Sequence, residues 1–302
     1  MENQIRVAVI VLTMDQRDRT RRCLQSFQAV TSPPLRLVLW DNGSRDDTAA
    51  LVRREFPAVR VQEHPENLGV AGGRNAAAAL AIAEFQPTHL FFIDNDMTVT
   101  PGFLHALMRP FAADPRLAQT TGKIRIMGTR RLYGAGGCEV SFWRGRTSHV
   151  GHGEEDRGQR DRPGPCIPSG GCMLVRTDVF RELGGFDERF NPYGPEDLDF
   201  GLRVRRAGYR ALYVPEAVVH HELAPSRTFS GGQYSEQYVR NKTRQWFRFM
   251  RAHASPAERA GFLLVSAPWL LARAVVREAR QGNLGAVKGM FAGAVDLLRS
   301  GK

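Results

Sequence analysis

Apolar runs alternate with amphipathic segments along the first third of this chain. The runs predict buried strands at residues 5–12, 35–40, 59–62 and 90–94. Segments with apolar residues at helical spacing predict helices at residues 17–29, 48–56 and 75–85, the second with Thr48 as its N-cap. Strands and helices that alternate at this pace predict a parallel sheet with helices on both faces.

Polar residues follow three of these predicted strands, at residues 13–15, 41–44 and 94–96. Ligands bind beyond the carboxyl ends of parallel strands, so the three clusters indicate a site at one edge of the sheet. In the last cluster, Asp94 and Asp96 stand two residues apart, and on an extended chain both carboxylates face the same side. Such a pair suits Mg²⁺ or Mn²⁺ beside a substrate phosphate, although the triplet alone fits a polar turn equally well.

A glycine-rich turn at residues 67–74 precedes the third predicted helix. Gly72 and Gly73 allow close approach to the backbone at a helix N-terminus, and Arg74 can pair with an anionic oxygen. The sequence contains neither G-x-G-x-x-G nor G-x-x-x-x-G-K-[ST]. Their absence counts against a dinucleotide cofactor and against a P-loop ATPase.

The composition is that of an ordinary globular protein, with 302 residues of which 42% are hydrophobic and 24% charged. This length allows one large domain or two smaller ones. The four cysteines form no C-x-x-C pair, and no N-terminal signal sequence is evident. We therefore expect a cytoplasmic protein without disulfides or structural zinc.

The formal net charge of +11 is concentrated near the C-terminus. Residues 240–302 hold twelve Lys and Arg against three Asp and Glu, an excess of nine. Their apolar run at residues 260–272 has thirteen residues, too short for a membrane span, which takes about twenty. Basic amphipathic helices suit an anionic membrane surface, and packing on the protein's own core or on a second subunit fits equally well. The oligomeric state stays open.

Two sets of motifs follow the order found in a known enzyme family. The first set comprises Leu39-Trp40-Asp41-Asn42-Gly43-Ser44, Asn67-Leu68-Gly69, Gly72-Gly73-Arg74-Asn75 and Asp94-Asn95-Asp96. The second comprises Ser169-Gly170-Gly171-Cys172, Gly184-Gly185-Phe186-Asp187, Glu196-Asp197-Leu198-Asp199 and Arg205-Arg206-Ala207-Gly208-Tyr209. Over residues 5–250 the chain resembles family 2 glycosyltransferases of the GT-A type, and among them bacterial rhamnosyltransferase-like enzymes of surface polysaccharide synthesis.

The resemblance implies an α/β fold with a Rossmann-like, mostly parallel sheet flanked by helices and a C-terminal helical extension. The GT-A domain would span residues 1–235, with a nucleotide-sugar half at 1–127 and an acceptor and catalytic half at 128–235. Residues 236–302 would form the basic helical extension. Residues 128–165 lack periodicity, and we expect an irregular flank of the acceptor site there.

The resemblance also implies roles for individual residues. Asp41 would contact the base of the nucleotide with Thr13 nearby, while Asn67 and Arg74 would serve the nucleotide and its diphosphate. The metal ligands, for Mn²⁺ or Mg²⁺, would be Asp94, Asp96 and His221, with Asp94 also close to the ribose and sugar. Gly73 and Gly171 would border the substrate. Within the pair Glu196 and Asp197, the second carboxylate matches the family's general base.

Chemistry agrees with these implied roles. A metal and Arg74 would neutralise charge on the departing nucleoside diphosphate, and a carboxylate base would deprotonate the acceptor hydroxyl. One base without a covalent nucleophile predicts inversion at the anomeric carbon. The donor would be a dTDP- or UDP-sugar, with rhamnose as one option, and the acceptor a glycan or a lipid-linked molecule. The enzyme would work in the cytoplasm, either free or peripheral on the inner face of the plasma membrane.

Two other functions compete with this hypothesis. A nucleotidyltransferase acting on a sugar phosphate shares the sheet and the D-x-D, but it would release pyrophosphate and has no evident use for Asp197. A non-enzymatic nucleic-acid binder would use the basic C-terminal part, which lacks a recognised nucleic-acid module. We therefore expect no nucleic-acid partner.

Overall fold

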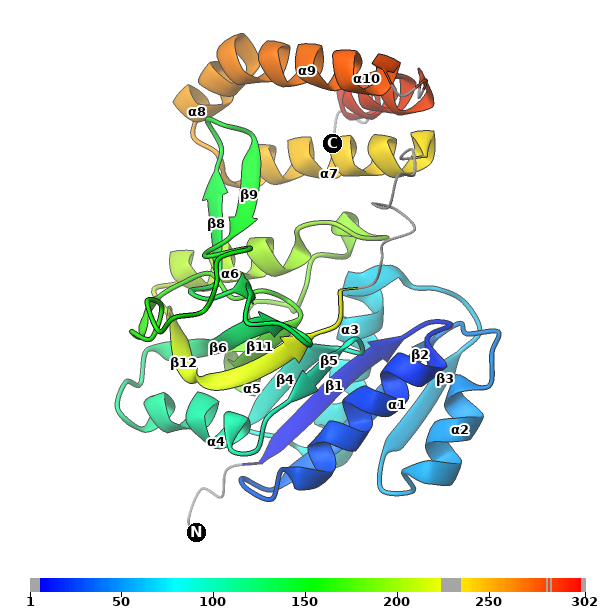
Figure 1. Cartoon of the computed structure of the whole chain (residues 1–302), viewed down its shortest axis with the longest axis vertical. Coiled ribbons are helices and arrows are strands. Elements are labelled where there is room, and N and C mark those ends of the chain that lie inside the picture. Colours follow the sequence, from blue (N-terminus) through cyan, green and yellow to red (C-terminus); the bar gives the residue numbers. More distant parts are fainter. Residues whose placement is uncertain (1–5, 224–234, 281, 283, 300–302) are drawn as a thin grey trace. The chain divides into compact units, whose positions relative to one another are not determined.

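The structure is a computed structural model that describes residues 6–223, 235–280, 282 and 284–299, without the side chains of residues 279, 284 and 297–299. The chain forms two compact units (Figure 1). Unit 1 comprises Met1–Glu139, His149–Pro192 and Glu196–Glu222. Unit 2 comprises Val140–Ser148, Tyr193–Pro195 and Leu223–Lys302. The division at residue 235, and the two functional halves before it, stay predictions.

Unit 1 is built on one large mixed sheet (Figure 1). Its strands are β1 (Val7–Thr13), β2 (Leu35–Asn42), β3 (Arg60–His64), β4 (His89–Asp94), β5 (Met97–Val99), β6 (Leu117–Ile126), β7 (Leu132–Gly134), β10 (Gly164–Pro165), β11 (Cys172–Arg176) and β12 (Arg210–His221). The main path runs β10-β12-β6-β11-β4-β1-β2-β3. Strands β4, β1, β2 and β3 are parallel, whereas β11 is antiparallel to both β4 and β6.

Helices cover both faces of this sheet. They are α1 (Arg17–Ser26), α2 (Thr48–Glu55), α3 (Gly69–Phe85), α4 (Phe103–Met108), α5 (Thr177–Glu182) and α6 (Glu196–Arg206), with short 3₁₀ turns at Phe27–Ala29, Arg109–Ala112 and Glu188–Phe190. Alternate residues of β1 enter different cores: Val9 packs in the core with α1, α2 and α4, whereas Ile10 packs in the core with α3, α5 and α6. Burial on both faces explains why the strands read as continuous apolar runs. The predicted fold class is confirmed.

Helix α3 begins earlier than the sequence indicated. The turn predicted at residues 67–74 ends at Leu68, and Gly69–Phe85 is one helix, so Gly72, Gly73 and Arg74 lie in its first turns. Glycine is a poor helix former, which is why the pattern predicted a loop. Close packing overrides that preference, because a Cβ atom at Gly73 would lie 2.6 Å from Leu12 Cδ1 of β1.

Two further local predictions are wrong. The N-cap of α2 is Asp47 rather than Thr48, and the Asp46 side chain accepts a hydrogen bond from the Thr48 amide at 3.0 Å. Residues 128–165, expected to be irregular, contain the short strands β7 and β10 of the large sheet. They also contain the separate two-stranded sheet of β8 (Cys138–Ser141) and β9 (Arg146–His149).

Unit 2 is mainly helical. Its helices are α7 (Glu236–His253), α8 (Pro256–Gly261), α9 (Ala267–Arg280) and α10 (Leu284–Arg299), with a π-helical turn Phe262–Ser266 between α8 and α9. Helix α10 packs tightly on α7, where a Cβ atom at Gly289 would lie 2.4 Å from the Glu236 carbonyl oxygen. Arg240 and Asp296 form an ion pair of 2.7 Å between the same two helices.

The helical run of unit 2 is longer than its uncharged core indicated. Helices α8 and α9 continue through the π-helical turn, and Pro256–Glu278 gives 23 residues of mean hydropathy 1.4, long and apolar enough to cross a membrane by length and composition. The prediction that this segment is too short is therefore wrong, because it counted only residues 260–272. Only 11% of the most apolar window is buried inside the protein.

Candidate active site

The predicted polar clusters meet at one edge of the sheet. In the parallel register, Thr13 of β1 stands opposite Asp41 of β2, and Leu12 stands opposite Asp94 of β4. The carboxyl ends of these three adjacent strands therefore carry the predicted donor-side residues next to one another.

A buried arginine joins the two halves of the sequence. From α3, Arg74 donates from Nη2 to Asp94 Oδ1 at 2.7 Å and from Nη1 to Glu196 Oε1 at 3.1 Å. Its guanidinium also lies 5.8 Å from the centre of the Phe186 ring. Arg74 and Glu196 are each only 5% exposed. Arg74 was expected to pair with an anionic ligand, and the structure gives it two protein carboxylates as partners.

The electrostatics of this cluster are strongly coupled. Burial opposes the charged form of Arg74, yet the charges of Asp94 and Glu196 raise the pKa of the guanidinium above its ordinary value. Burial, and then the charge of Asp197, raise the pKa of Glu196 to about 7, although Arg74 acts against that rise. The cluster therefore keeps a permanent cation beside a carboxyl group that resists ionisation.

Asp197 is held differently from its neighbour Glu196. Asp197 is half-buried, and its Oδ2 accepts a hydrogen bond from the Gly170 amide at 2.7 Å. Its Oδ1 accepts one from the Leu198 amide at 2.8 Å, at the first turn of α6. Two amide donors fix the direction of this carboxylate.

The segment Gly170–Gly171 runs between these acidic side chains with no room for a side chain of its own. A Cβ atom at Gly170 would lie 2.5 Å from Arg74 Nη1, and one at Gly171 would lie 2.6 Å from Asp94 Oδ2. The carbonyl oxygen of Gly171 accepts a hydrogen bond from the Asp94 amide at 3.3 Å. The structure thus brings Arg74, Asp94, Gly171, Glu196 and Asp197 together, as one site requires.

Asp96 contacts a different partner. It lies in the turn between β4 and β5 rather than on the strand, and its Oδ1 is 3.3 Å from Nε2 of His221, at the end of β12. Intervening Asn95 turns inward and donates to Thr13 Oγ1 at 3.1 Å. The two carboxylates of the D-x-D therefore meet separate protein groups, Asp94 with Arg74 and Asp96 with His221.

The pair of Asp96 and His221 fits a divalent cation. Asp96 Oδ1 is buried without a hydrogen-bond partner and lies 3.3 Å from His221 Nε2, and a carboxylate oxygen beside an imidazole nitrogen is a donor set that Mn²⁺ accepts. Over the described part of the chain, no group of three or more His, Cys, Asp or Glu side chains is arranged to hold a metal ion. An ion held by one or two protein ligands completes its shell with water and phosphate oxygens. Asp94 as a further ligand stays a prediction.

The other predicted donor residues have partners inside the protein. Thr13 Oγ1 contacts Thr20 Oγ1 at 2.8 Å, and Asp41 Oδ1 accepts from the Ser44 amide at 2.8 Å. Asn67 Oδ1 accepts from the Gly69 amide at 2.7 Å, which satisfies a free amide at the start of α3. These contacts shape the edge of the site, and the nucleotide contacts of Thr13, Asp41, Asn67 and Gly73 stay predictions.

Sequence reasoning missed two aromatic side chains near the carboxylates. The Tyr133 ring lies 4.3 Å from that of His221 and 4.6 Å from that of His149. Burial raises the pKa of Tyr133 to about 12, and the charges of Asp94 and Asp96 add to the rise. Tyr133 and His149 both come from residues 128–165, the segment without periodicity, where the signal was an aromatic residue and two histidines among charged residues.

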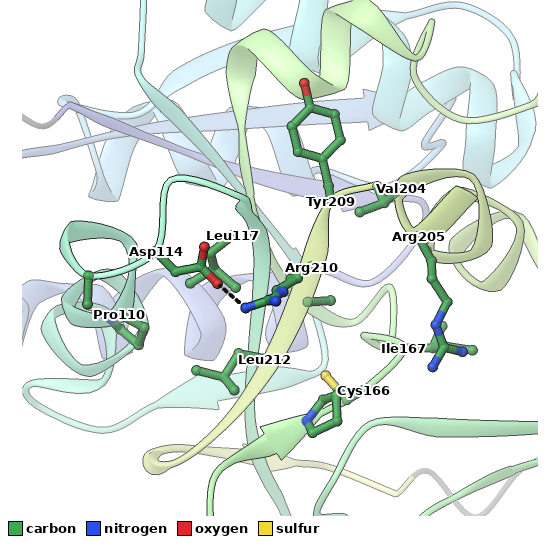
Figure 2. A pocket seen from close by; sticks show the side chains of 14 residues that line it. Pro110, Asp114, Leu117, Cys166, Ile167, Val204, Arg205, Tyr209, Arg210 and Leu212 are labelled. Atoms are coloured by element: carbon green, nitrogen blue, oxygen red, sulfur yellow. Dashed lines mark hydrogen bonds and ion pairs between the residues drawn. The ribbon is translucent and has the colours of Figure 1, made fainter. Parts of the chain in front are cut away.

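A separate apolar cavity lies elsewhere in unit 1. It has a volume of about 560 Å³, and Figure 2 shows Leu212 and Ile167 among its lining residues, together with the ion pair of Asp114 and Arg210. It contains none of the predicted site residues. It shares α6 with the carboxylate cluster, because Gly201 of that helix belongs to its wall.

Comparison with known proteins gives one family. The family described as "Glycosyltransferase like family 2" matches residues 4–247. An N-acetylglucosaminyl-diphospho-decaprenol L-rhamnosyltransferase of Mycobacterium tuberculosis is 30% identical over 236 residues, which cover 72% of this chain and 76% of the relative. An O-antigen biosynthesis protein of Myxococcus xanthus is 29% identical over 74% of this chain and 18% of its own length.

Solved structures share the fold at low sequence identity. A crystal structure of GalNAc-T7 with UDP, GalNAc and Mn²⁺ has a TM-score of 0.68 and 16% identity, covering 99% of this chain and 57% of that protein. A mannosyltransferase of Pyrobaculum calidifontis in complex with GDP-Man and Mn²⁺ has a TM-score of 0.60 and 18% identity, covering 100% of this chain and 89% of that protein.

Proposed function

Because this chain belongs to glycosyltransferase-like family 2, we propose that it is an inverting, metal-dependent glycosyltransferase. It would move a sugar from a nucleotide-sugar donor to a hydroxyl group of a glycan or lipid-linked acceptor. One observation carries the proposal: Arg74, Asp94 and Glu196 form a buried network at the carboxyl end of β4, with Asp197 beside it.

Asp197 is the better candidate for the general base. It is half-buried and held by two amide donors, so it would present an oriented carboxylate to an acceptor hydroxyl. Glu196 is 5% exposed and tied to Arg74, so it would act by positioning Arg74 rather than by touching substrate. A single base that drives direct displacement by the acceptor oxygen inverts the anomeric carbon.

The donor side needs charge neutralised as the nucleoside diphosphate leaves. Asp96 and His221, with Asp94 as the further ligand, would hold Mn²⁺ or Mg²⁺, which supplies positive charge to the diphosphate oxygens when bound. Arg74 orients Asp94 toward the same edge of the sheet, and its own positive charge adds to the field there. Asp41 and Asn67, at the next strand end and at the start of α3, would meet the nucleotide.

The donor and acceptor classes rest on relatives. The Mycobacterium tuberculosis relative is named as an L-rhamnosyltransferase that acts on a diphospho-decaprenol acceptor, and the Myxococcus xanthus relative as an O-antigen biosynthesis protein. These names support rhamnose as the first sugar to test, a lipid-linked acceptor and a role in the synthesis of surface polysaccharide. A dTDP- or UDP-linked donor and a place on the inner face of the plasma membrane are part of the proposal.

The test is a product assay with matched variants. The full chain is incubated with dTDP-rhamnose or UDP-sugars, Mn²⁺ and an extract of membrane lipids, and the released phosphates are identified. The proposal predicts nucleoside diphosphate, a fall of about 10²–10⁴-fold in turnover for Asp197→Asn, and unchanged donor binding in that variant. A parallel reaction with dTTP or UTP and a sugar 1-phosphate tests the alternative, because pyrophosphate release there would identify a nucleotidyltransferase. Full activity of Asp197→Asn in the transfer assay would refute the assignment of the base.

A further inference from the structure

The helical run Pro256–Arg280 of unit 2 presents an apolar face to solvent. Leu264 is 79% exposed, Val265 69%, Trp269 57% and Val276 50%. Val265, Trp269 and Val276 are separated by four and seven residues, so they share one side of the helix. We call Leu264, Val265, Trp269 and Val276 the outer face. Large side chains this exposed and this close together mark an interaction surface.

The start of the same run is anchored inside unit 2. Phe262 is 5% exposed, and its ring lies 6.0 Å from that of Phe247 and 6.5 Å from that of Trp246, both on α7. Gly261 lies directly under Trp143 at the tip of the β8–β9 hairpin, where a Cβ atom would approach the indole to 1.7 Å. The start of the run is therefore fixed on unit 2, while Trp269 and Val276 line an open apolar groove together with residues of α7 and α10.

Arginines accompany the outer face. Arg273 lies 4.4 Å from the Trp269 ring centre, and Arg273 and Arg280 are exposed. Arg277 pairs with Glu278, which is 1% exposed and is the one acid of α9. The charge presented beside the apolar residues is thus positive, and an anionic partner complements it.

We propose that the outer face docks into the headgroup region of an anionic lipid bilayer, with α9 lying in the membrane plane. Aromatic and branched apolar side chains flanked by arginine are the composition that binds such a surface. A spanning orientation is disfavoured although Pro256–Glu278 is long enough, because charged side chains are costly in a hydrocarbon core and this run carries Glu258, Arg259, Arg273, Arg277 and Glu278. The inference rests on the proposed function only in that a lipid-linked acceptor would lie at the same surface.

The experiment is flotation of the full chain with vesicles of phosphatidylcholine alone or mixed with phosphatidylglycerol. Two double variants alter the outer face: Leu264→Ser with Trp269→Ser, and Arg273→Gln with Arg280→Gln. The matched control, Arg54→Gln with Arg157→Gln, removes the same charge from side chains of unit 1 that are 65% and 76% exposed. Circular dichroism checks that all variants fold.

We expect binding only to vesicles with phosphatidylglycerol. The double variant Arg273→Gln with Arg280→Gln should weaken vesicle binding about thirtyfold, because each arginine near an anionic surface contributes about a factor of five to the affinity. The apolar pair should weaken it at least about tenfold, and the control should bind like the parent. High salt or alkaline carbonate should release the bound protein, as it does for a helix that lies on the membrane.

Three results would overturn the inference. The first is equal binding to neutral vesicles. The second is resistance to carbonate, which would identify a spanning helix. The third is a dimer in lipid-free solution that the double variant Leu264→Ser with Trp269→Ser abolishes, which would assign the face to a second copy. A thermal shift with UDP or dTDP on the same preparation separates this inference from the proposed function. If nucleotide stabilises a protein that ignores vesicles, only the membrane inference fails.

Discussion

The substitution Glu196→Gln should make the folded protein more stable above neutral pH. The side chain is 5% exposed, and burial together with the charge of Asp197 raises its pKa from 4.5 to about 7. Glutamine keeps an oxygen that accepts the hydrogen bond of Arg74, and it removes only the ionisable group. Arg74 keeps the negative charges of Asp94 and Asp197 as neighbours.

The size and sign follow from proton linkage. Below pH 4.5 the carboxyl group of Glu196 is protonated in the folded and unfolded states, so it carries no penalty. Between pH 4.5 and about 7 the unfolded state ionises first, and the stability of the folded state falls. Above pH 7 the penalty is complete at about 3 kcal/mol, which Glu196→Gln should recover.

The assay is urea unfolding of the parent and of Glu196→Gln at several pH values between 4 and 8, followed by circular dichroism. The difference in unfolding free energy should be near zero at the acid end and should grow to about 3 kcal/mol at pH 8. Glu216→Gln, whose side chain is 54% exposed, is the control and should show no such trend. A difference that stays constant with pH, or that favours the parent at pH 8, would show that the fold does not oppose ionisation of Glu196.

Three further predictions concern single positions. Gly171→Ala would put a methyl group 2.6 Å from Asp94 Oδ2, and the resulting displacement should lower the initial transfer rate about a hundredfold with little change in melting temperature. Burial, and then the charge of Arg176, lower the pKa of His89 from 6.5 to about 4. The stability that neutral His89 allows is therefore present above pH 6.5 and is lost as the pH falls toward 4. In urea titrations over that range, His89→Leu should lose about 3 kcal/mol less unfolding free energy than the parent. The ring of Tyr133 restrains His221, so Tyr133→Ala should weaken Mn²⁺ binding at least about tenfold, whereas Tyr133→Phe should bind normally. Electron paramagnetic resonance measures the bound Mn²⁺, and equal binding by the two variants would contradict the restraint.

The strands that form the site were readable in the sequence because they are buried on both faces. The runs ending at Thr13, Asp41 and Asp94 gave both the strands and the polar residues at their carboxyl ends, and their register then aligns those residues. The spacing of Glu196 and Asp197 from these strands carried no such information. Only the family resemblance predicted that they share the site. The contact of Arg74 with Glu196 is made by the tertiary fold, between residues far apart in the sequence.

The missed features depend on packing between distant segments. Gly69–Gly73 is helical where α3 lies close to Asn191 at Gly69 and to Leu12 of β1 at Gly73, and no local propensity encodes these contacts. Tyr133 reaches His221 because β7 pairs with β6, in a segment whose strands are too short to show alternation. The length of the α8 and α9 run was underestimated because a π-helical turn continues it through residues that pattern reading divides.

The most direct test of a metal-dependent donor site is nucleotide binding by the purified chain. Thermal unfolding is followed with UDP, dTDP and GDP, with and without Mn²⁺, for the parent and for Asp96→Ala. If the site binds its donor through a metal, one nucleotide should stabilise the parent by about 2.7 kcal/mol at a hundred times its dissociation constant, only with Mn²⁺, and Asp96→Ala should abolish the effect. A nucleotide shift that persists without metal and in Asp96→Ala, or no shift with any nucleotide, would contradict a metal-dependent donor site.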